Sequence, residues 1–317
     1  MATTRIIGGW GSTESQIFYD KTLISRALPK LVHDQYGRKS PIPAGSGITI
    51  NWRKFEAIAD SETALTEGTP GAAVNPSVSS VTATIAQYGQ FAYVSDLLED
   101  QAIDRVTTEL TANFGEAMGK SRDIIVRDVL VAGSTLQYAS TSGSLGGVGS
   151  GMLLNTAEIR EAVATLRVNN ADPIEDELFI GIIHPNTQRD LLADSTLLTA
   201  WNGAYPRSES NNFAKGTIGD VLGVRFVVTS NAAKGASLGM SGADVYYALS
   251  MGKGYYAVTE LSAEQARTYI KPKGSAGTED PIDQKSSIGY KFAMAAARLD
   301  ENACVRIDHV CTSKMAA

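Results

Sequence analysis

Residues 81–94 read VTATIAQYGQFAYV, a run in which apolar residues alternate with small or polar ones. Period-two alternation is typical of a strand, and here it places Ile85 and Phe91 on one face. An earlier segment, ITINWR at residues 48–53, alternates in the same way and puts Ile48, Ile50 and Trp52 together. The turn-rich stretch EGTPGAAVNPS lies between the two segments. The sequence therefore predicts a long two-stranded hairpin with a wide tip.

A hairpin of this length cannot bury its own apolar residues. Two strands alone have almost no core, and eight residues of strand already reach about 27 Å. The apolar face formed by Ile48, Ile50, Trp52, Ile85 and Phe91 therefore needs a surface to lie on. That surface belongs either to its own domain or to a neighbouring molecule.

The strongest helix signal follows the hairpin directly. Apolar residues recur at steps of three, four or seven across residues 97–131, which is the spacing of a helix with one buried face. Asp96 and Glu99 offer a capping box at its start, and Gly133 closes the run. Such a helix would be about 50 Å long, which is unusual for a compact domain. A short break is expected near residues 100–104.

The second half of the chain alternates helix and strand signals. Residues 139–151, ASTSGSLGGVGSG, are typical of a linker. Asn155 can cap a helix that ends before Pro173. Further strands are expected at residues 178–183, 224–229, 245–250, 255–261, 290–299 and 303–311, with a short helix at 186–192. This order indicates an α/β region followed by two tail strands.

Residues 1–35 differ from the rest because they form an arm. Phe18 and Tyr19 stand among its apolar residues, and no partner element lies nearby in the sequence. Aromatic residues on an unpartnered terminal segment suggest docking on another surface.

Composition excludes several classes of function. Of the 317 residues, 43% are hydrophobic and 20% are charged, which is ordinary for a globular protein with a sizeable core. Acidic residues number 34 and basic residues 28, giving a net charge of −6. No basic cluster of the kind that grips phosphates occurs, so a sequence-specific DNA binder is not expected. Passive contact with DNA stays compatible with this charge.

The sequence indicates neither a targeting segment nor a metal site. The N-terminal stretch MATTRIIGGWGSTESQ lacks the apolar core of a signal peptide. The uncharged residues 129–157 contain too much Gly and Ser to span a membrane. Cys304 and Cys311, the two cysteines, are typical of buried thiols in a reducing compartment rather than of zinc ligands. We therefore expect a soluble protein, intracellular or released by lysis, without metal or cofactor.

Three features that could carry enzymatic chemistry do not meet its requirements. GEAMGKS at residues 115–121 has three residues between its glycines where a phosphate loop needs four. GKGYYA at residues 252–257 is followed by strand-forming residues, whereas a dinucleotide fingerprint needs a helix there. His184, before Pro185, could act as a base but has no partner motif. No coherent catalytic site is expected.

These elements form one pattern that runs through most of the chain. It is carried by FYDKTLISRALPKLV (18–32), IPAGSGITINWR (42–53), LTEGTP (65–70), NNA (169–171), IIHPNTQRDL (182–191), IGDVLGVRFVVTS (218–230) and KPKGSAGTEDPIDQKSSIGYK (271–291). In their order these segments resemble the major capsid proteins of tailed bacteriophages, which have the Hong Kong 97 fold. Within that group the chain looks most like the family typified by the major capsid protein of phage N-four.

The resemblance implies an α+β fold with a division of labour along the chain. Residues 1–35 would be an N-terminal arm on a neighbouring subunit, and residues 36–95 an extended β-hairpin loop over the next subunit. Residues 96–149 would form a peripheral domain with a spine helix, and residues 150–268 an axial domain. Residues 269–317 would return as strands of the peripheral domain.

The resemblance also implies a structural function. Subunits would self-assemble through hexamers and pentamers into an icosahedral head shell around double-stranded DNA, in the host cytoplasm, and end in the virion. Scaffolding, portal and decoration proteins would be further partners, contact with DNA would be non-specific, and neither a membrane, a catalytic residue nor a cofactor would be involved. The expected subunit-interface residues are Phe18, Tyr19, Ile48, Ile50, Trp52, Ile85 and Phe91.

Two alternatives and one departure accompany this interpretation. An encapsulin-like shell that stores cargo enzymes would share the fold. An α/β enzyme could use residues 150–268 with His184 as base, but it would leave the arm and hairpin unexplained. In the phage that names the fold, Lys–Asn bonds cross-link subunits. Lys54 lies near a strand rather than at the hairpin tip here, and Asn302 is the conceivable acceptor, so cross-linking is not expected.

Overall fold

The computed structural model describes residues 31–43, 45–58, 60–62, 64, 67–68, 73–102, 106–140, 142–197, 218–262, 266–275 and 280–312. Phe18 and Tyr19, the arm residues predicted to contact a neighbour, lie outside these ranges. Among the described residues, no helix combines the length and the apolar character that crossing a membrane requires.

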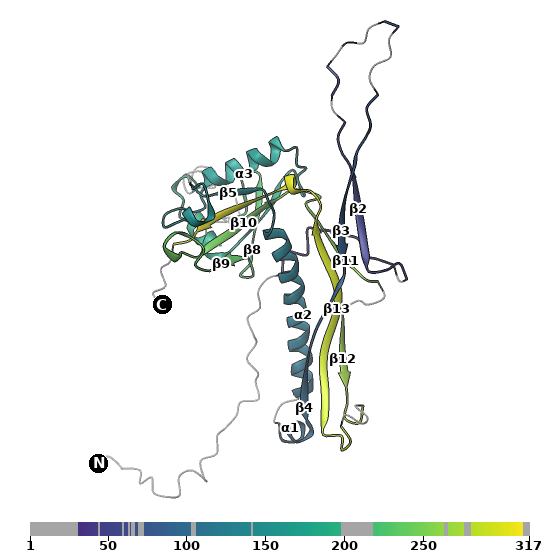
Figure 1. The fold of residues 1–317 in the computed structure, drawn as a ribbon. Helices are drawn as coiled ribbons and strands as arrows, with labels where there is room; N and C mark the ends of the chain where they lie inside the picture. Colours follow the sequence, from purple (N-terminus) through teal and green to yellow (C-terminus); the bar gives the residue numbers. More distant parts are fainter. Residues whose placement is uncertain are drawn as a thin grey trace, which may run out of the picture.

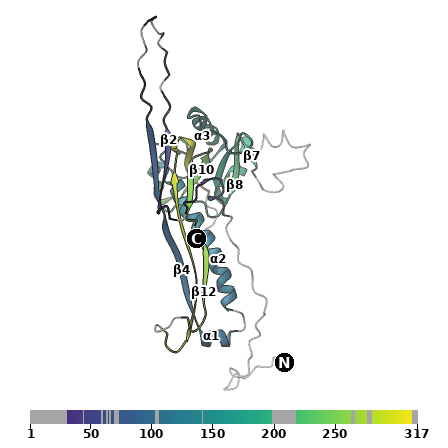
Figure 2. The same ribbon diagram turned by 90° about the vertical axis from the view of Figure 1, so that its right-hand side faces the viewer.

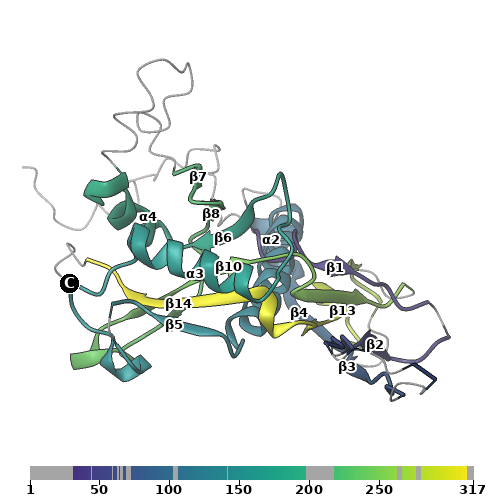
Figure 3. The ribbon, with the colours of Figure 1, turned by 90° about the horizontal axis from the view of Figure 1, so that it is seen from above.

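A seven-stranded sheet forms one body of the molecule. Its strand order is β5-β14-β10-β6-β8-β7, and β9 pairs with β10. The strands are β5 (Leu136–Tyr138), β6 (Phe179–Ile183), β7 (Asp220–Val221), β8 (Val224–Val228), β9 (Lys234–Gly235), β10 (Val245–Met251) and β14 (Cys304–Val310). Helices α3 (Thr156–Val168) and α4 (Pro185–Leu192) bury Ile159, Leu166 and Leu191 against this sheet (Figure 3). Strand β6 is buried along its whole length, as its continuous apolar run predicts.

An elongated five-stranded sheet forms the second body. Its strands are β1 (Arg38–Lys39), β4 (Ala86–Ser95), β11 (Tyr256–Glu260), β12 (Arg267–Lys271) and β13 (Lys285–Arg298). The 14-residue strand β13 is its axis, because it pairs with β4, β11 and β12. Helix α2 (Val106–Val131) runs along one face (Figures 1 and 2). We call this the helix face and the opposite one the open face.

One hydrophobic cluster joins the two bodies. Val126 and Leu130, near the end of α2, are fully buried. They belong to the same cluster as Ile182 of the seven-stranded sheet and Phe292 of the elongated sheet. The helix therefore holds both sheets through its last turns, while its first turns cover the elongated sheet alone.

The hairpin differs from the prediction in where its second strand ends. Strand β2 (Thr49–Phe55) pairs with β3 (Val78–Thr84), and together they project from the molecule (Figures 1 and 2). The predicted strand 81–94 is interrupted at Ile85, beyond which β4 pairs with β13. The prediction of one long hairpin strand was therefore wrong, since its second half belongs to the elongated sheet.

The long helix is confirmed, with the expected break. Helix α1 (Asp96–Gln101) is separate from α2. Ser95 caps α1, because its side-chain oxygen accepts a hydrogen bond from the Leu98 amide at 3.4 Å. The predicted cap at Asp96 was thus one residue late. Asn155 caps α3 as predicted, accepting from the Glu158 amide at 3.0 Å.

Two further expectations need correction. The tail strands were predicted to complete the peripheral sheet together, but only β13 does so, whereas β14 pairs with β10 and β5. The segment predicted as a linker, residues 139–151, contains the fully buried Val148, which packs against Val245 and Val310. Its glycines allow tight turns, so a few apolar residues suffice to fix it on the seven-stranded sheet.

Candidate assembly interface

The projecting hairpin exposes the apolar residues that a monomer would bury. Among them, Phe55 is 76% exposed and Ile48 is 56% exposed. Ile58, Val74 and Val78 are also large, apolar and exposed. Such a concentration on an element without its own core marks a protein–protein contact.

The base of the hairpin rests on its own subunit. Ile85 is buried with Ile42 and Ala293, and Ile50 packs against this cluster. Lys54 Nζ also donates to Asp300 Oδ2 at 2.6 Å. The hydrogen bond to Asp300 raises the pKa of Lys54. These contacts set the direction in which the hairpin leaves the subunit.

The predicted interface residues of the hairpin therefore differ in how far they are available for contact. Ile48 is exposed and available, and Ile50 and Trp52 are half-buried. Ile85 is 8% exposed, so within the subunit it is a core residue rather than a free contact. Phe91 is 66% exposed but lies on β4, opposite Gly289 of β13, and not on the hairpin.

A groove of about 510 Å³ lies on the elongated sheet beside Phe91. Strand register places Phe91, Gly289 and Tyr269 in one row across β4, β13 and β12. Because Gly289 has no side chain, the middle of this row is low and the two aromatic rings form its sides. Lys271 and Tyr93 also line the groove. The groove could not be predicted from the sequence, because β12, which supplies Tyr269 and Lys271, was not predicted.

The charges of the hairpin tip and the open face are opposite. The tip, residues 56–77, contains Glu56, Asp60, Glu62 and Glu67 and no Lys or Arg. Register places four basic residues on the open face of β4, β12 and β13, where these strands carry no acidic residue. The basic residues are Arg267, Lys271, Lys285 and Lys291. The two surfaces are therefore complementary in charge as well as in apolar character.

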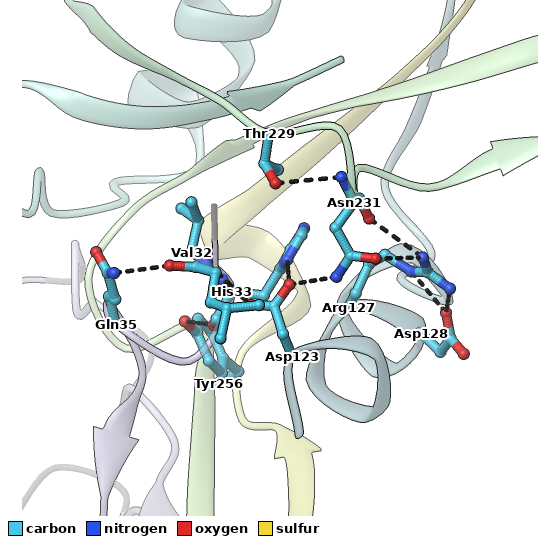
Figure 4. A network of polar contacts seen from close by, with 10 residues as sticks. Val32, His33, Gln35, Asp123, Arg127, Asp128, Thr229, Asn231 and Tyr256 are labelled. Atoms are coloured by element: carbon cyan, nitrogen blue, oxygen red, sulfur yellow. Dashed lines mark hydrogen bonds and ion pairs between the residues drawn. The ribbon is translucent and has the colours of Figure 1, made fainter. Parts of the chain in front are cut away.

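Asp123 of α2 joins the start of the described chain to the seven-stranded body (Figure 4). One oxygen accepts from the Val32 and His33 amides at 2.9 and 2.8 Å, and the other contacts His33 Nδ1 at 2.9 Å and the Asn231 side-chain amide. Burial alone would raise the pKa of Asp123, but the contacts with His33 and Asn231 lower it. The carboxylate therefore holds the arm base, the helix and the loop after β8 together.

His184 is a structural residue in this arrangement. Its Nδ1 accepts from the Asn186 amide at 3.1 Å, which caps α4. Burial and, to a smaller extent, Lys234 lower its pKa. His184 lines a surface depression together with Arg127 and Lys234. Both of these cations have acidic partners, Arg127 with Asp128 and Lys234 with Asp244. GEAMGKS lies inside α2, as its sequence context predicts.

The two cysteines are buried thiols, and the described residues contain no cluster of ligands suited to a metal ion. Burial raises the pKa of Cys304 to about 12 and that of Cys311 to about 11. A thiol that stays protonated is a poor nucleophile and a poor ligand.

Together, the elongated sheet with its long helix, the separate α/β body and the projecting hairpin define the α+β Hong Kong 97 capsid fold. A family model described as phage capsid protein matches residues 78–307. The chain belongs to the phage capsid protein family, and it is a structural major capsid protein of a bacteriophage.

Solved capsid structures share this fold over nearly the whole chain. The cyanophage Pam1 capsid matches with a TM-score of 0.74 and 13% identity, covering 96% of this chain and 99% of that one. The cyanophage P-SCSP1u capsid matches with a TM-score of 0.71 and 13% identity, covering 94% of this chain and 93% of that one. The Ralstonia phage GP4 capsid matches with a TM-score of 0.71 and 12% identity, covering 100% of both chains. No curated protein sequence matches significantly. Neither alternative, the encapsulin-like shell or the enzyme, is favoured by these findings.

Proposed function

We propose that copies of this chain close into an icosahedral head shell around double-stranded DNA, with the hairpin of one subunit lying on the open face of the next. The observation that carries the proposal is the match between the exposed apolar, acidic hairpin and the aromatic, basic groove. A contact between two different surfaces is head-to-tail, and head-to-tail contacts close rings when the rotation between copies allows it. Hexamers and pentamers are the rings that such a shell needs.

The two bodies would have different roles in the shell. The seven-stranded body would be the axial domain that meets its copies around the ring axis, and the elongated sheet with α2 would be the peripheral domain. The arm, with Phe18 and Tyr19, would lie on a neighbouring subunit. Each contact is modest by itself, but many contacts per subunit make a closed shell stable through multivalency.

The shell would assemble in the cytoplasm of the bacterial host. Scaffolding, portal and decoration proteins would be its further partners. The net charge of −6 suits a container whose wall must not bind DNA tightly. The proposed role is structural and needs no catalytic residue. The narrower relation to the family of the phage N-four capsid protein stays a prediction.

Charge reversal tests the proposed contact. A tip variant carries Asp60→Lys, Glu62→Lys and Glu67→Lys, and an open-face variant carries Lys271→Glu and Lys285→Glu. Each should reduce the yield of assembled particles about ten-fold, because like charges then face each other. A chain carrying both sets should assemble again, since the complementarity is restored with reversed signs.

Sedimentation and negative-stain electron microscopy of the purified chains measure the yield. Glu161→Lys, on the exposed side of α3, is the control for a change of surface charge and should assemble normally. If the three-residue tip variant and the two-residue open-face variant both assembled normally, the proposed contact would be wrong. It would also be wrong if the combined chain stayed unassembled while each chain remained folded.

A further inference from the structure

Strand β4 has one free edge. It pairs with β13 through residues 86–95 on one side, and no described strand pairs with its other side. Figure 2 shows β4 along the border of the molecule, with α2 beyond the sheet on the other side. Nine of its ten residues are at least partly exposed, and Val94 is the buried one. Ten residues of edge present about 33 Å of backbone donors and acceptors to the surroundings.

This edge lacks the protection that natural proteins give to edges. Residues 78–95, which span β3 and β4, contain no Lys, Arg, Asp, Glu or Pro. Strand β12 lies on the other side of β13 and offers a comparison within the same sheet. It has five residues, begins with Arg267, ends with Lys271 and is followed by Pro272. Short length, terminal charges and proline are devices that prevent edge pairing, so β12 is protected and β4 is not.

We infer that the free edge of β4 pairs antiparallel with β4 of a second copy, across a two-fold axis centred on Gln90. This contact rests on the proposed self-association into a shell, but it uses the edge of the sheet and leaves the groove on the open face for the hairpin. The occupant follows from the sequence of β4 itself.

An antiparallel pair of identical strands has its two-fold axis perpendicular to the sheet, so each residue faces one of the same parity. With Gln90 on the axis, Phe91 faces Gly89, Tyr88 faces Ala92 and Val94 faces Ala86. Each of these large side chains then faces a small residue, and Gln90 faces its own copy, where the amide groups can hydrogen-bond. Aromatic side chains opposite glycine stabilise strand pairs.

The absence of charge also favours a second copy over another partner. A charged strand paired with itself places like charges opposite each other near the axis, which is destabilising. Strand β4 has no charged residue, so pairing with its own copy brings no such repulsion. Strand β2 of the projecting hairpin carries Arg53 and Lys54 and would repel itself. Its partner β3 is also uncharged, but its edge is seven residues long, compared with ten in β4.

A charge at the axis tests the inference. Gln90→Lys should lower the particle yield about ten-fold, since two ammonium groups would face each other, and Gln90→Glu should do the same. Mixing the two variants before assembly should restore particles, because Lys then faces Glu across the axis. Thr268→Lys, exposed on the protected strand β12, is the matched control and should assemble like the unmodified chain. Circular dichroism confirms that each variant is folded.

The outcomes separate this inference from the proposed function. If the unmodified chain formed no particles, the proposed shell would fail. If the unmodified chain and Gln90→Lys assembled equally well, only the edge pairing would be overturned. If Gln90→Lys blocked assembly and the mixture with Gln90→Glu did not restore it, the edge would be occupied by something other than β4, which also overturns the self-pairing.

Discussion

Asp123 is the side chain on which the buried polar contacts between distant segments converge. It is 1% exposed and receives hydrogen bonds from residues about 90 and 108 positions away in the chain. A carboxylate in this position is stable because two backbone amides, His33 Nδ1 and the Asn231 side-chain amide all contact it. The same convergence makes the site sensitive to any change that removes an acceptor.

Asp123→Asn should destabilise the folded chain by about 2–4 kcal/mol, because an amide N–H would replace an acceptor and face other donors. Urea unfolding of the purified chain measures the effect. Asp128→Asn, five residues further along α2 and 60% exposed at its side chain, should change the unfolding free energy by less than about 0.5 kcal/mol. Equal losses for the two variants would contradict the role of Asp123.

His309 predicts a pH dependence of stability. It is 1% exposed, and burial lowers its pKa to about 4, compared with about 6.5 in an unfolded chain. Between these pH values the unfolded chain binds a proton that the folded chain does not. Stability should therefore fall as the pH falls from 6.5 to 4, by up to about 1.4 kcal/mol per pH unit.

Urea titrations of the full chain at several pH values check this slope. His309→Gln should remove most of it, while its contact with Thr187 can be kept by the amide. Burial raises the pKa of the neighbouring Asp308, which has the opposite effect on the slope but is present in both chains. An unchanged slope in the variant would show that another group titrates.

The surroundings of Lys54 disfavour covalent cross-linking between subunits. Its side chain is 51% exposed and paired with Asp300, which raises its pKa. A protonated, hydrated amine is a poor nucleophile. Assembled particles should therefore run as a single band of 33.6 kDa on a denaturing gel. A ladder of multiples that disappears in Lys54→Met would contradict this expectation.

At the scale of elements, local patterns predicted most helices and strands but not their partners. The alternation of residues 81–94 continues through Ile85, so nothing in it signals that the strand changes partner there. Strand β12 was missed because RTYIK lacks a regular apolar pattern, and with it the Tyr269 side of the groove was missed. Ile85 was assigned to an interface because its burial depends on Ala293, which is distant in sequence.

The hairpin should loosen when its base is weakened. Ile85→Ala removes buried methyl groups from the small cluster with Ile42, which should cost about 2 kcal/mol or more. Hydrogen exchange in β2 and β3 should accelerate, while α3 in the other body stays protected. Ile58 is 57% exposed in the tip, so Ile58→Ala should leave both the stability and the hydrogen exchange of β2 and β3 unchanged. Faster exchange throughout the molecule would mean that the cluster is not local to the hairpin.

At the scale of the whole molecule, the described surfaces would serve different contacts. The hairpin and the open face form one complementary pair, and the β4 edge is complementary to itself. A shell needs both kinds, because head-to-tail contacts build rings and two-fold contacts join rings to one another. The fold could be recognised from sequence, whereas these surfaces required the register of β13 with its neighbours.

Assembly should weaken with salt. The hairpin contact pairs an acidic tip with a basic face, and salt screens exposed charges over about 10 Å at 0.1 M. The fraction of chain sedimenting as particles should fall between 0.05 and about 0.5 M NaCl at low protein concentration. The chain with both surfaces reversed in charge should show the same dependence. A yield that rises steadily with salt would indicate that apolar contacts alone drive assembly.

Electron cryomicroscopy of particles purified from cells that express the chain tests the central claim most directly. We expect closed shells in which the hairpin of each subunit lies over β4, β13 and β12 of its neighbour, with the acidic tip against the basic open face. Particles in which the hairpin contacts only its own subunit, or a preparation that contains monomers alone at assembly concentrations, would contradict it.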